Sequence, residues 1–152
     1  MLMIRGIMLT MTLAVGGIAA ADATVQDKGT RTPQLNYVLH CQGCHLPDGS
    51  GKTGLVPDMR RELPRFARAP AGRNYIAQVP GVATSRLNDA EVAELLNWLV
   101  VKMDSSAAMP FTPYTAVEIA GLRVHWLQNP KQVRAALVSH LEDKVPHDGG
   151  TP

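Results

Sequence analysis

The amino-acid sequence predicts an all-α fold. In several segments, apolar residues recur at three- and four-residue spacing, which is the period of a helix with one buried face. Residues that favour helix N-termini, namely threonine, asparagine and proline, stand at the starts of these segments. No convincing strand pattern accompanies the first of them. We therefore expect helices joined by loops.

The chain opens with a segment typical of a secretory signal peptide, residues 1–23. Arg5 supplies a basic start, residues 6–18 are apolar and uncharged, and small residues offer cleavage after Ala21 or Ala23. The apolar run is shorter than the roughly 20 residues that span a bilayer. We expect export to the periplasm and no stable membrane insertion after cleavage, with an uncleaved anchor as the alternative.

Composition places limits on the remaining chain, whose length of about 130 residues suits one domain. Aromatic residues make up only 5% of the sequence, which also contains 11 prolines and 13 glycines. These figures indicate a modest hydrophobic core. The formal charge of +2 is small, and nothing in the sequence indicates a nucleic-acid partner.

The first predicted helix begins at Thr32, which can cap it, and has Pro33 in its first turn. Its apolar stripe leads toward Cys41 and consists of Leu35, Val38 and Leu39. Residues 46–54 are rich in glycine and show no regular period, so they are expected to form a loop. Because glycine lacks a side chain, the backbone of such a loop can approach a bound planar group closely.

Three further helices are predicted before residue 104. Residues 60–68 form a short one broken by Pro64, and residues 73–78 form another. The clearest helix spans Asn88 to Lys102, since Asn88 can cap it and Glu91 completes a capping box. Its wide buried face, with Trp98 at the edge, consists of Val92, Leu95, Leu96, Leu99 and Val100.

Two more helices are predicted beyond this point, in an extension over residues 105–143. The first begins with a capping box at Thr115 and runs to about Leu127, and the second runs from Pro130 to about Leu141. We expect these helices to pack on the preceding domain, although a docking surface for a partner is the alternative. The tail, residues 144–152, is expected to be disordered.

The most specific motif is C-x-x-C-H, formed by Cys41, Cys44 and His45. Two thiols at this spacing can form thioether bonds to the two vinyl groups of one haem. The histidine that follows can then supply a neutral ring nitrogen as an axial ligand of the iron. The motif therefore predicts one covalent haem c.

Other interpretations of these residues fit less well. A thioredoxin-like dithiol begins a helix after a strand, whereas here the preceding segment is a predicted helix. A structural zinc site needs four ligands, and this motif offers three at tight spacing. A plain disulfide between the two cysteines leaves His45 without a role.

The segment from Pro33 to Val101 resembles a class I cytochrome c. The matching residues are Cys41 to His45, the Asp48-Gly-Ser-Gly51 loop, the Pro57-x-Met59 stretch and the helix start at Leu87. The resemblance implies a class I cytochrome c-like helical fold around one haem, over residues 32–104, with two extra C-terminal helices. In the loop where the family usually places its second axial ligand, residues 78–84, this chain has neither methionine nor histidine.

The second axial ligand must therefore come from elsewhere or be absent. Met109, followed by proline in a segment without helical pattern, is the first candidate. Met103, Met59 and His125 are the alternatives. His40 is expected to point away from the distal face, because it immediately precedes the first cysteine.

The function implied is one-electron transfer in the periplasm. The protein would carry electrons from a donor dehydrogenase to an acceptor oxidase or reductase and would not itself be an enzyme. Alternatively, it is the haem subunit of a larger complex with a second cytochrome subunit, or a gas-binding or weakly peroxidatic protein with an open iron site.

Arginines are concentrated between residues 60 and 73. The simplest explanation is a solvated face. Arginine can also bind a haem propionate through two hydrogen bonds, and Arg61 or Arg73 is the candidate for that role.

Overall fold

The computed structural model describes residues 31–104 and 110–143, and the regular elements in these ranges are α-helices. The all-α prediction is therefore confirmed for this part of the chain, where only an isolated bridge between Lys52 and Val56 has β character. The predicted signal peptide, the C-terminal tail and Met109 lie outside the described residues. None of the described helices has the length and apolarity needed to cross a membrane.

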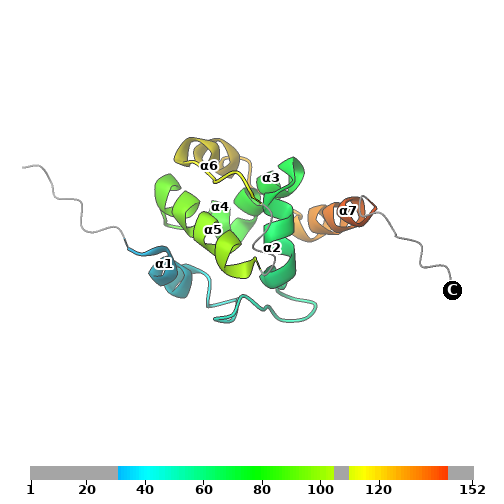
Figure 1. The fold of residues 1–152 in the computed structure, drawn as a ribbon, viewed down its shortest axis with the longest axis horizontal. Helices are drawn as coiled ribbons and strands as arrows, with labels where there is room; N and C mark the ends of the chain where they lie inside the picture. The colour runs from blue at the N-terminus through cyan, green and yellow to red at the C-terminus, as the bar shows by residue number, and fades with distance from the viewer. Residues whose placement is uncertain (1–30, 105–109, 144–152) are drawn as a thin grey trace, which may run out of the picture.

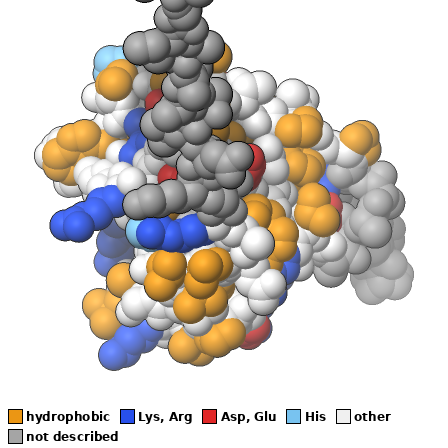
Figure 2. Space-filling model, turned by 90° about the vertical axis from the view of Figure 1, so that its left-hand side faces the viewer, with side chains coloured by type: hydrophobic (Ala, Val, Ile, Leu, Met, Phe, Trp, Pro, Cys, Tyr) orange, Lys and Arg blue, Asp and Glu red, His pale blue; other side chains and the backbone are white. Residues whose placement is uncertain are grey.

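Helix α1 (Pro33–His40) exposes the apolar stripe that the sequence gives it. Its N-cap Thr32 accepts a hydrogen bond from the Leu35 N–H, as predicted. Its buried residues are Asn36 and Tyr37, and the Tyr37 ring packs on Trp98 of α5 with centroids 5.9 Å apart. Figure 2 looks onto this end of the molecule and shows hydrophobic side chains at the surface, and those contributed by α1 are Leu35, Val38 and Leu39.

Helices α2 (Met59–Ala67), α3 (Pro70–Gln78) and α4 (Pro80–Ala83) follow one another closely. Helix α2 continues through Pro64 where a break was predicted. Proline removes one backbone donor, whose helical acceptor would be the carbonyl of the exposed Arg60. Gly72 brings α3 against α2, since a Cβ at this position would overlap the Phe66 backbone.

Helix α5 (Asp89–Met103) lies at the centre of the fold, and α1, α2 and α6 pack on it (Figure 1). The predicted capping box is confirmed: the Glu91 N–H donates to Asn88 Oδ1, and the Asn88 N–H donates to Glu91 Oε2, each at 2.9 Å. The predicted buried face is also confirmed. It includes Val92, Leu95, Leu96, Leu99 and Val100, each at most 5% exposed.

Helices α6 (Ala116–Arg123) and α7 (Pro130–Glu142) occupy different sides of the molecule (Figure 1). Helix α6 packs on α5, α3 and α4, whereas α7 packs on α3. Helix α6 ends four residues before the predicted position. The Leu127 N–H donates instead to the Gln78 carbonyl at the end of α3, at 2.9 Å, which ties the connection between α6 and α7 to the domain.

Candidate functional site

The C-x-x-C-H motif forms a tight turn directly after α1. The Cys41 N–H donates to the Tyr37 carbonyl at 2.9 Å, which completes the last turn of the helix. The N–H groups of Cys44 and His45 then both donate to the Cys41 carbonyl, at 3.1 and 2.9 Å. The chain therefore folds back on itself between the two cysteines, which are free thiols.

The side chains of this turn line a cavity of about 590 Å³. Cys41, Cys44 and His45 form part of its wall, and the buried face of α5 forms another part through Val92, Leu95, Leu96 and Leu99. Further apolar residues come from α2, α3 and the loop before α2, including Leu55, Val56, Leu63, Phe66 and Ile76. The volume lies within the range of roughly 300–1,000 Å³ that is usual for small-molecule and cofactor sites.

His45 presents a half-buried imidazole to this cavity. Its Nδ1 atom is buried and has no hydrogen-bond partner among the described residues. Burial lowers the pKa of His45, and the nearby Asp58 carboxylate opposes this shift only in part. The imidazole is therefore kept in its neutral form, which is the form that binds a metal ion.

Cys41 has the properties of a half-buried thiol and not of an activated one. Burial, together with the neighbouring Cys44, raises the pKa of Cys41 to about 11. Catalytic dithiols have lowered thiol pKa values and lie at the beginning of a helix, whereas this pair follows the end of α1. In addition, the described residues contain no group of three or more side chains arranged to bind a metal ion by themselves.

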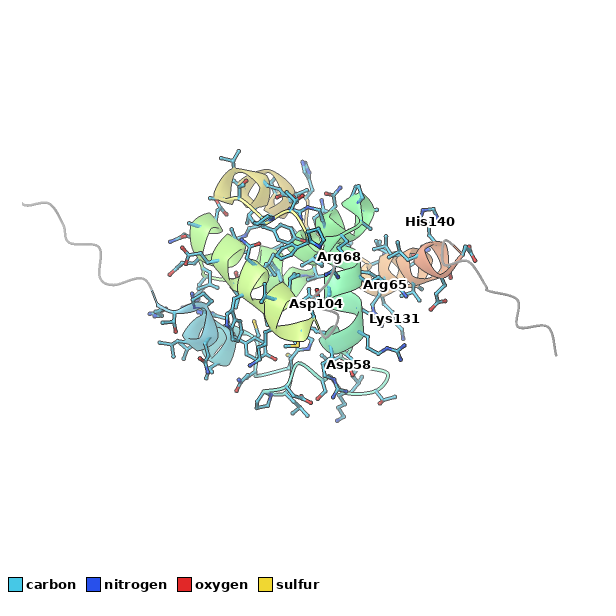
Figure 3. All side chains as sticks on the ribbon, viewed as in Figure 1. Asp58, Arg65, Arg68, Asp104, Lys131 and His140 are labelled. Carbon is cyan, nitrogen blue, oxygen red and sulfur yellow. The ribbon has the colours of Figure 1, made fainter. Side chains whose placement is uncertain are left out.

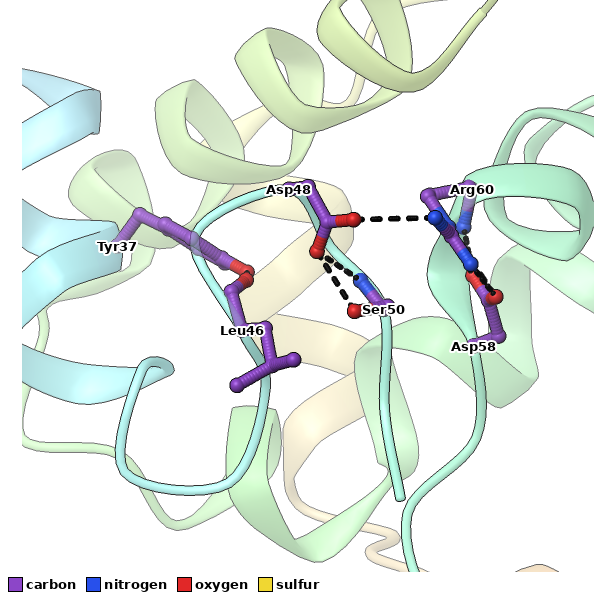
Figure 4. Close-up of polar contacts among 6 residues, drawn as sticks. All are labelled: Tyr37, Leu46, Asp48, Ser50, Asp58 and Arg60. Carbon is purple, nitrogen blue, oxygen red and sulfur yellow. Dashed lines mark hydrogen bonds and ion pairs between the residues drawn. The ribbon is translucent and has the colours of Figure 1, made fainter. Parts of the chain in front are cut away.

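The loop between the motif and α2 contributes residues 53–57 to the cavity lining, and Figure 4 shows the polar contacts that hold this loop. Asp48 Oδ1 accepts hydrogen bonds from the Ser50 N–H and hydroxyl, at 3.0 and 2.6 Å, and Asp48 Oδ2 accepts one from Arg60. Arg60 also binds Asp58, the N-cap of α2. These hydrogen bonds lower the pKa values of Asp48 and Asp58, so both carboxylates stay charged and hold the loop in place.

A second hydrogen bond ties the same loop to α1. The Tyr37 hydroxyl donates to the Leu46 carbonyl at 2.6 Å, immediately after the motif (Figure 4). Gly49 adopts a positive φ of 85°, in the region that favours glycine, and the Met103 thioether lies where a Cβ on this glycine would project. The loop is therefore held by both α1 and the end of α5.

The residues considered from the sequence as a second ligand of the iron differ in whether they line the cavity. Met59 lines the cavity. Met103 is buried against Gly49 and is not among the lining residues. His125 is exposed and also lies away from the lining. Met109, the first candidate, lies outside the described residues.

Several residues line the cavity without having been singled out for it. His40 is among them, although we expected it to point away from the distal face, and its Nε2 atom is buried with no hydrogen-bond partner among the described residues. The cavity lining also includes three polar side chains that the sequence did not indicate, namely Tyr75 of α3 and Lys131 and Arg134 of α7. Only the three-dimensional arrangement could reveal the contribution of α7, because it lies far along the chain from the motif.

The two arginines considered for an anionic group do not reach the cavity. Arg61 is exposed and is not a lining residue. Arg73 binds Glu118 of α6 through two hydrogen bonds of 3.0 and 2.7 Å, and it also donates to the Thr112 carbonyl. Arg73 therefore stabilises the attachment of α6 and is turned away from the site.

In comparisons with known proteins, no family model, no curated protein and no solved structure matches this chain. The chemistry of the site has to be inferred from its own residues.

Proposed function

We propose that the cavity binds one covalently attached haem c and that the protein is a periplasmic one-electron carrier with a class I cytochrome c-like fold. The observation that carries this proposal is the placement of both motif thiols and the His45 imidazole on the wall of one large apolar cavity. A haem is a flat, largely apolar group, and the apolar faces of α2, α3 and α5 suit it. The buried His45 Nδ1 without a partner also fits a residue whose ring serves a bound group.

Each residue of the motif has a separate role in this proposal. The thiols of Cys41 and Cys44 would form thioether bonds to the vinyl groups, and the turn between them limits how the ring can lie. His45 would hold the haem iron through its imidazole, since burial lowers the pKa of this side chain and keeps it neutral. The bound haem would supply reversible one-electron exchange at its iron. The protein residues exclude water and hold the ring.

The natural partners of such a carrier are other redox proteins. We propose a donor dehydrogenase and an acceptor oxidase or reductase, with a second cytochrome subunit as an alternative setting. The exposed apolar residues of α1 lie in the helix that leads directly to Cys41, and a partner could approach the ring edge there. In this proposal the protein is a carrier and not an enzyme.

A second candidate function is gas binding or weak peroxidase activity at an open iron site. It is favoured by the positions of Met103 and His125, which both lie away from the cavity lining. Met109 remains our first candidate for the second ligand, and Met59 is the described methionine that lines the cavity. A carbon monoxide titration of the reduced protein separates the two functions, because a six-coordinate carrier would not respond whereas an open iron would.

The deciding experiment is production of the full chain in a host that can attach haem c, followed by a haem stain on a denaturing gel. We expect covalent haem in the native protein and none in the variant carrying both Cys41→Ala and Cys44→Ala. Gln42→Ala, a substitution in the spacer between the cysteines, is the control and should keep the haem. If the native protein loses all haem on the denaturing gel, the proposal is wrong.

The second ligand can be identified with the same preparation. Met109→Leu and Met59→Leu should be compared by visible spectroscopy in both oxidation states. The variant that loses the native low-spin spectrum identifies the ligand. If neither substitution changes the spectrum, the ligand is a different residue or the site is open.

A further inference from the structure

We propose that helix α7 holds the carboxylate edge of the haem, with Lys131 and Arg134 binding its propionate groups. This inference rests on the proposed function. It gives a specific role to a helix that the resemblance to class I cytochromes c does not cover.

The first observation is the source of the positive charge at the cavity. Lys131 and Arg134 are the lysine and arginine side chains among its lining residues, and both belong to α7. The arginine-rich segment around α2 contributes none, since its arginines are not among the lining residues. Arg60, for example, binds Asp48 and Asp58.

The second observation is the position of α7 relative to the cysteines. In haem, the two vinyl groups lie on adjacent pyrroles and the two propionates lie on the other two. A ring attached through Cys41 and Cys44 therefore turns its propionates away from the C-x-x-C-H turn. In Figure 1, α1, which ends at this turn, and α7 lie at opposite ends of the molecule, yet residues from both ends line the same cavity.

The charges that line the cavity leave Lys131 available for an anion. The carboxylates in the lining are Asp58, which Arg60 binds, and Glu62, which Arg134 binds. Lys131, which is labelled beside α7 in Figure 3, has no ion-pair partner among the described residues. The other titratable side chains in the lining are His40, Cys41, Cys44, His45 and Tyr75.

Arg134 can bind a second anion while it keeps Glu62. Its Nε and Nη2 atoms donate to the two Glu62 oxygens, with the Nε–Oε2 bond at 2.8 Å. A guanidinium has five N–H donors, so those on Nη1 remain for another acceptor. Glu62 therefore orients Arg134 toward the cavity without using up its hydrogen-bonding capacity.

The N-terminus of α7 adds to the positive potential. Pro130 lies in the first turn, and Asn129 makes no side-chain hydrogen bond to cap the helix. The first N–H groups of a helix and its dipole both favour a nearby negative charge. Since Pro130 and Lys131 both line the cavity, this end of the helix borders the site.

The test is the pH dependence of the reduction potential of the haem-bearing protein, which reports the ionisation of the propionates. A neighbouring cation lowers the pKa of a carboxyl group by about 1–3 units. The pH at which the reduction potential changes marks the propionate pKa. Lys131→Met and Arg134→Gln should therefore each raise this pH by about one unit. Glu62→Gln removes a neighbouring negative charge and should move it downward.

Arg61→Gln is the matched control, because Arg61 is exposed on α2 and does not line the cavity. It should not move the pH at which the reduction potential changes. Lys131→Met keeps the ion pair between Arg134 and Glu62, so its effect does not depend on a disturbed helix. The inference is overturned if Lys131→Met and Arg134→Gln leave this pH in place, or if Arg61→Gln moves it equally.

This result is distinct from failure of the proposed function. If the native protein carries covalent haem and the pH at which the potential changes does not respond to the α7 variants, the inference alone is wrong. If no covalent haem forms, both are wrong.

Discussion

Helices α6 and α7 are neighbours in the sequence but serve the fold in different ways. Helix α6 buries Ile119 completely, and Arg123 at its end binds three backbone carbonyls and Asp89. Helix α7 has one buried residue, Leu137, and instead contributes to the cavity wall. Two consecutive helices added to one domain therefore have different roles, since α6 stabilises the core and α7 borders the site.

The polar contacts follow the same division. The segment before α6 is fixed by Asn97 of α5, whose side chain donates to the Tyr114 carbonyl and accepts from the Tyr114 N–H, at 3.0 and 2.7 Å. The polar contacts of helix α7 include the Glu62–Arg134 ion pair, whose side chains are 25% and 29% exposed, and a hydrogen bond from Arg65 to the Val138 carbonyl. Pairs with this exposure contribute little to stability. We therefore expect substitutions in α6 to affect stability more than those in α7.

The largest effect is expected for Ile119→Ala. Removing a fully buried isoleucine side chain leaves a cavity between α6 and α5 and should lower the free energy of unfolding by about 4 kcal/mol. Urea denaturation measures this loss. Val117→Ala, on the same helix at a side chain 84% exposed, is the control and should cost almost nothing. Similar losses for the two variants would contradict the structural role of α6.

Arg123→Gln should have the next largest effect. The substitution removes the charged donors bound to the carbonyls of Ala83, Ser85 and Leu87, at the end of α4 and in the segment between α4 and α5. We expect the free energy of unfolding, measured by urea denaturation, to fall by about 3 kcal/mol. Hydrogen bonds from a charged group are stronger than those between neutral groups. The exposed Arg86→Gln provides the comparison. If Arg123→Gln lowers the free energy of unfolding no more than Arg86→Gln does, the Arg123 hydrogen bonds do not stabilise α6.

Leu137→Ala tests α7 in the same manner and should cost about 2 kcal/mol. Its side chain is 8% exposed and lies at the edge of the fold, so the neighbouring residues can partly fill the space. We also expect faster proteolysis within α7 in this variant and unchanged cleavage within α6. A loss as large as that of Ile119→Ala would remove the distinction between the two helices.

The smallest effect on stability is expected for Glu62→Gln. The partly exposed ion pair with Arg134 should contribute about 0.5 kcal/mol, and the contribution should fall further at high salt. Thermal unfolding at two salt concentrations provides the measurement, with the exposed Glu94→Gln on α5 as the reference. A change of several kcal/mol would mean that the pair stabilises the attachment of α7 and does more than orient Arg134.

The sequence was sufficient for features that depend on neighbouring residues. The capping box of α5 and its buried face were predicted correctly because cap residues and apolar spacing act within a few turns. The same local rules failed for the α2 break at Pro64 and for the end of α6, where the Gln78 carbonyl takes the Leu127 N–H. A hydrogen bond between segments so distant in the chain leaves no local pattern.

The candidate site shows the same limit. The C-x-x-C-H motif was visible because its residues are adjacent, whereas the α7 residues that face the same cavity carry no motif. Arg73 looked suitable for an anion from sequence alone, yet the structure pairs it with Glu118. Burial also differs from expectation in α1, where Asn36 faces inward and the apolar stripe faces outward. Which face of a short helix is covered depends on its neighbours.

The wall that α7 contributes has a consequence for biogenesis. Because α7 follows the other described helices along the chain, it is the last of them to leave the ribosome. Until it arrives, the cavity lacks the part of its wall that Pro130, Lys131 and Arg134 supply, and it is open on that side. Closing so long a loop costs little extra entropy, because the cost grows only slowly with length. The order of synthesis thus leaves an interval in which the cavity stays open before α7 completes its wall.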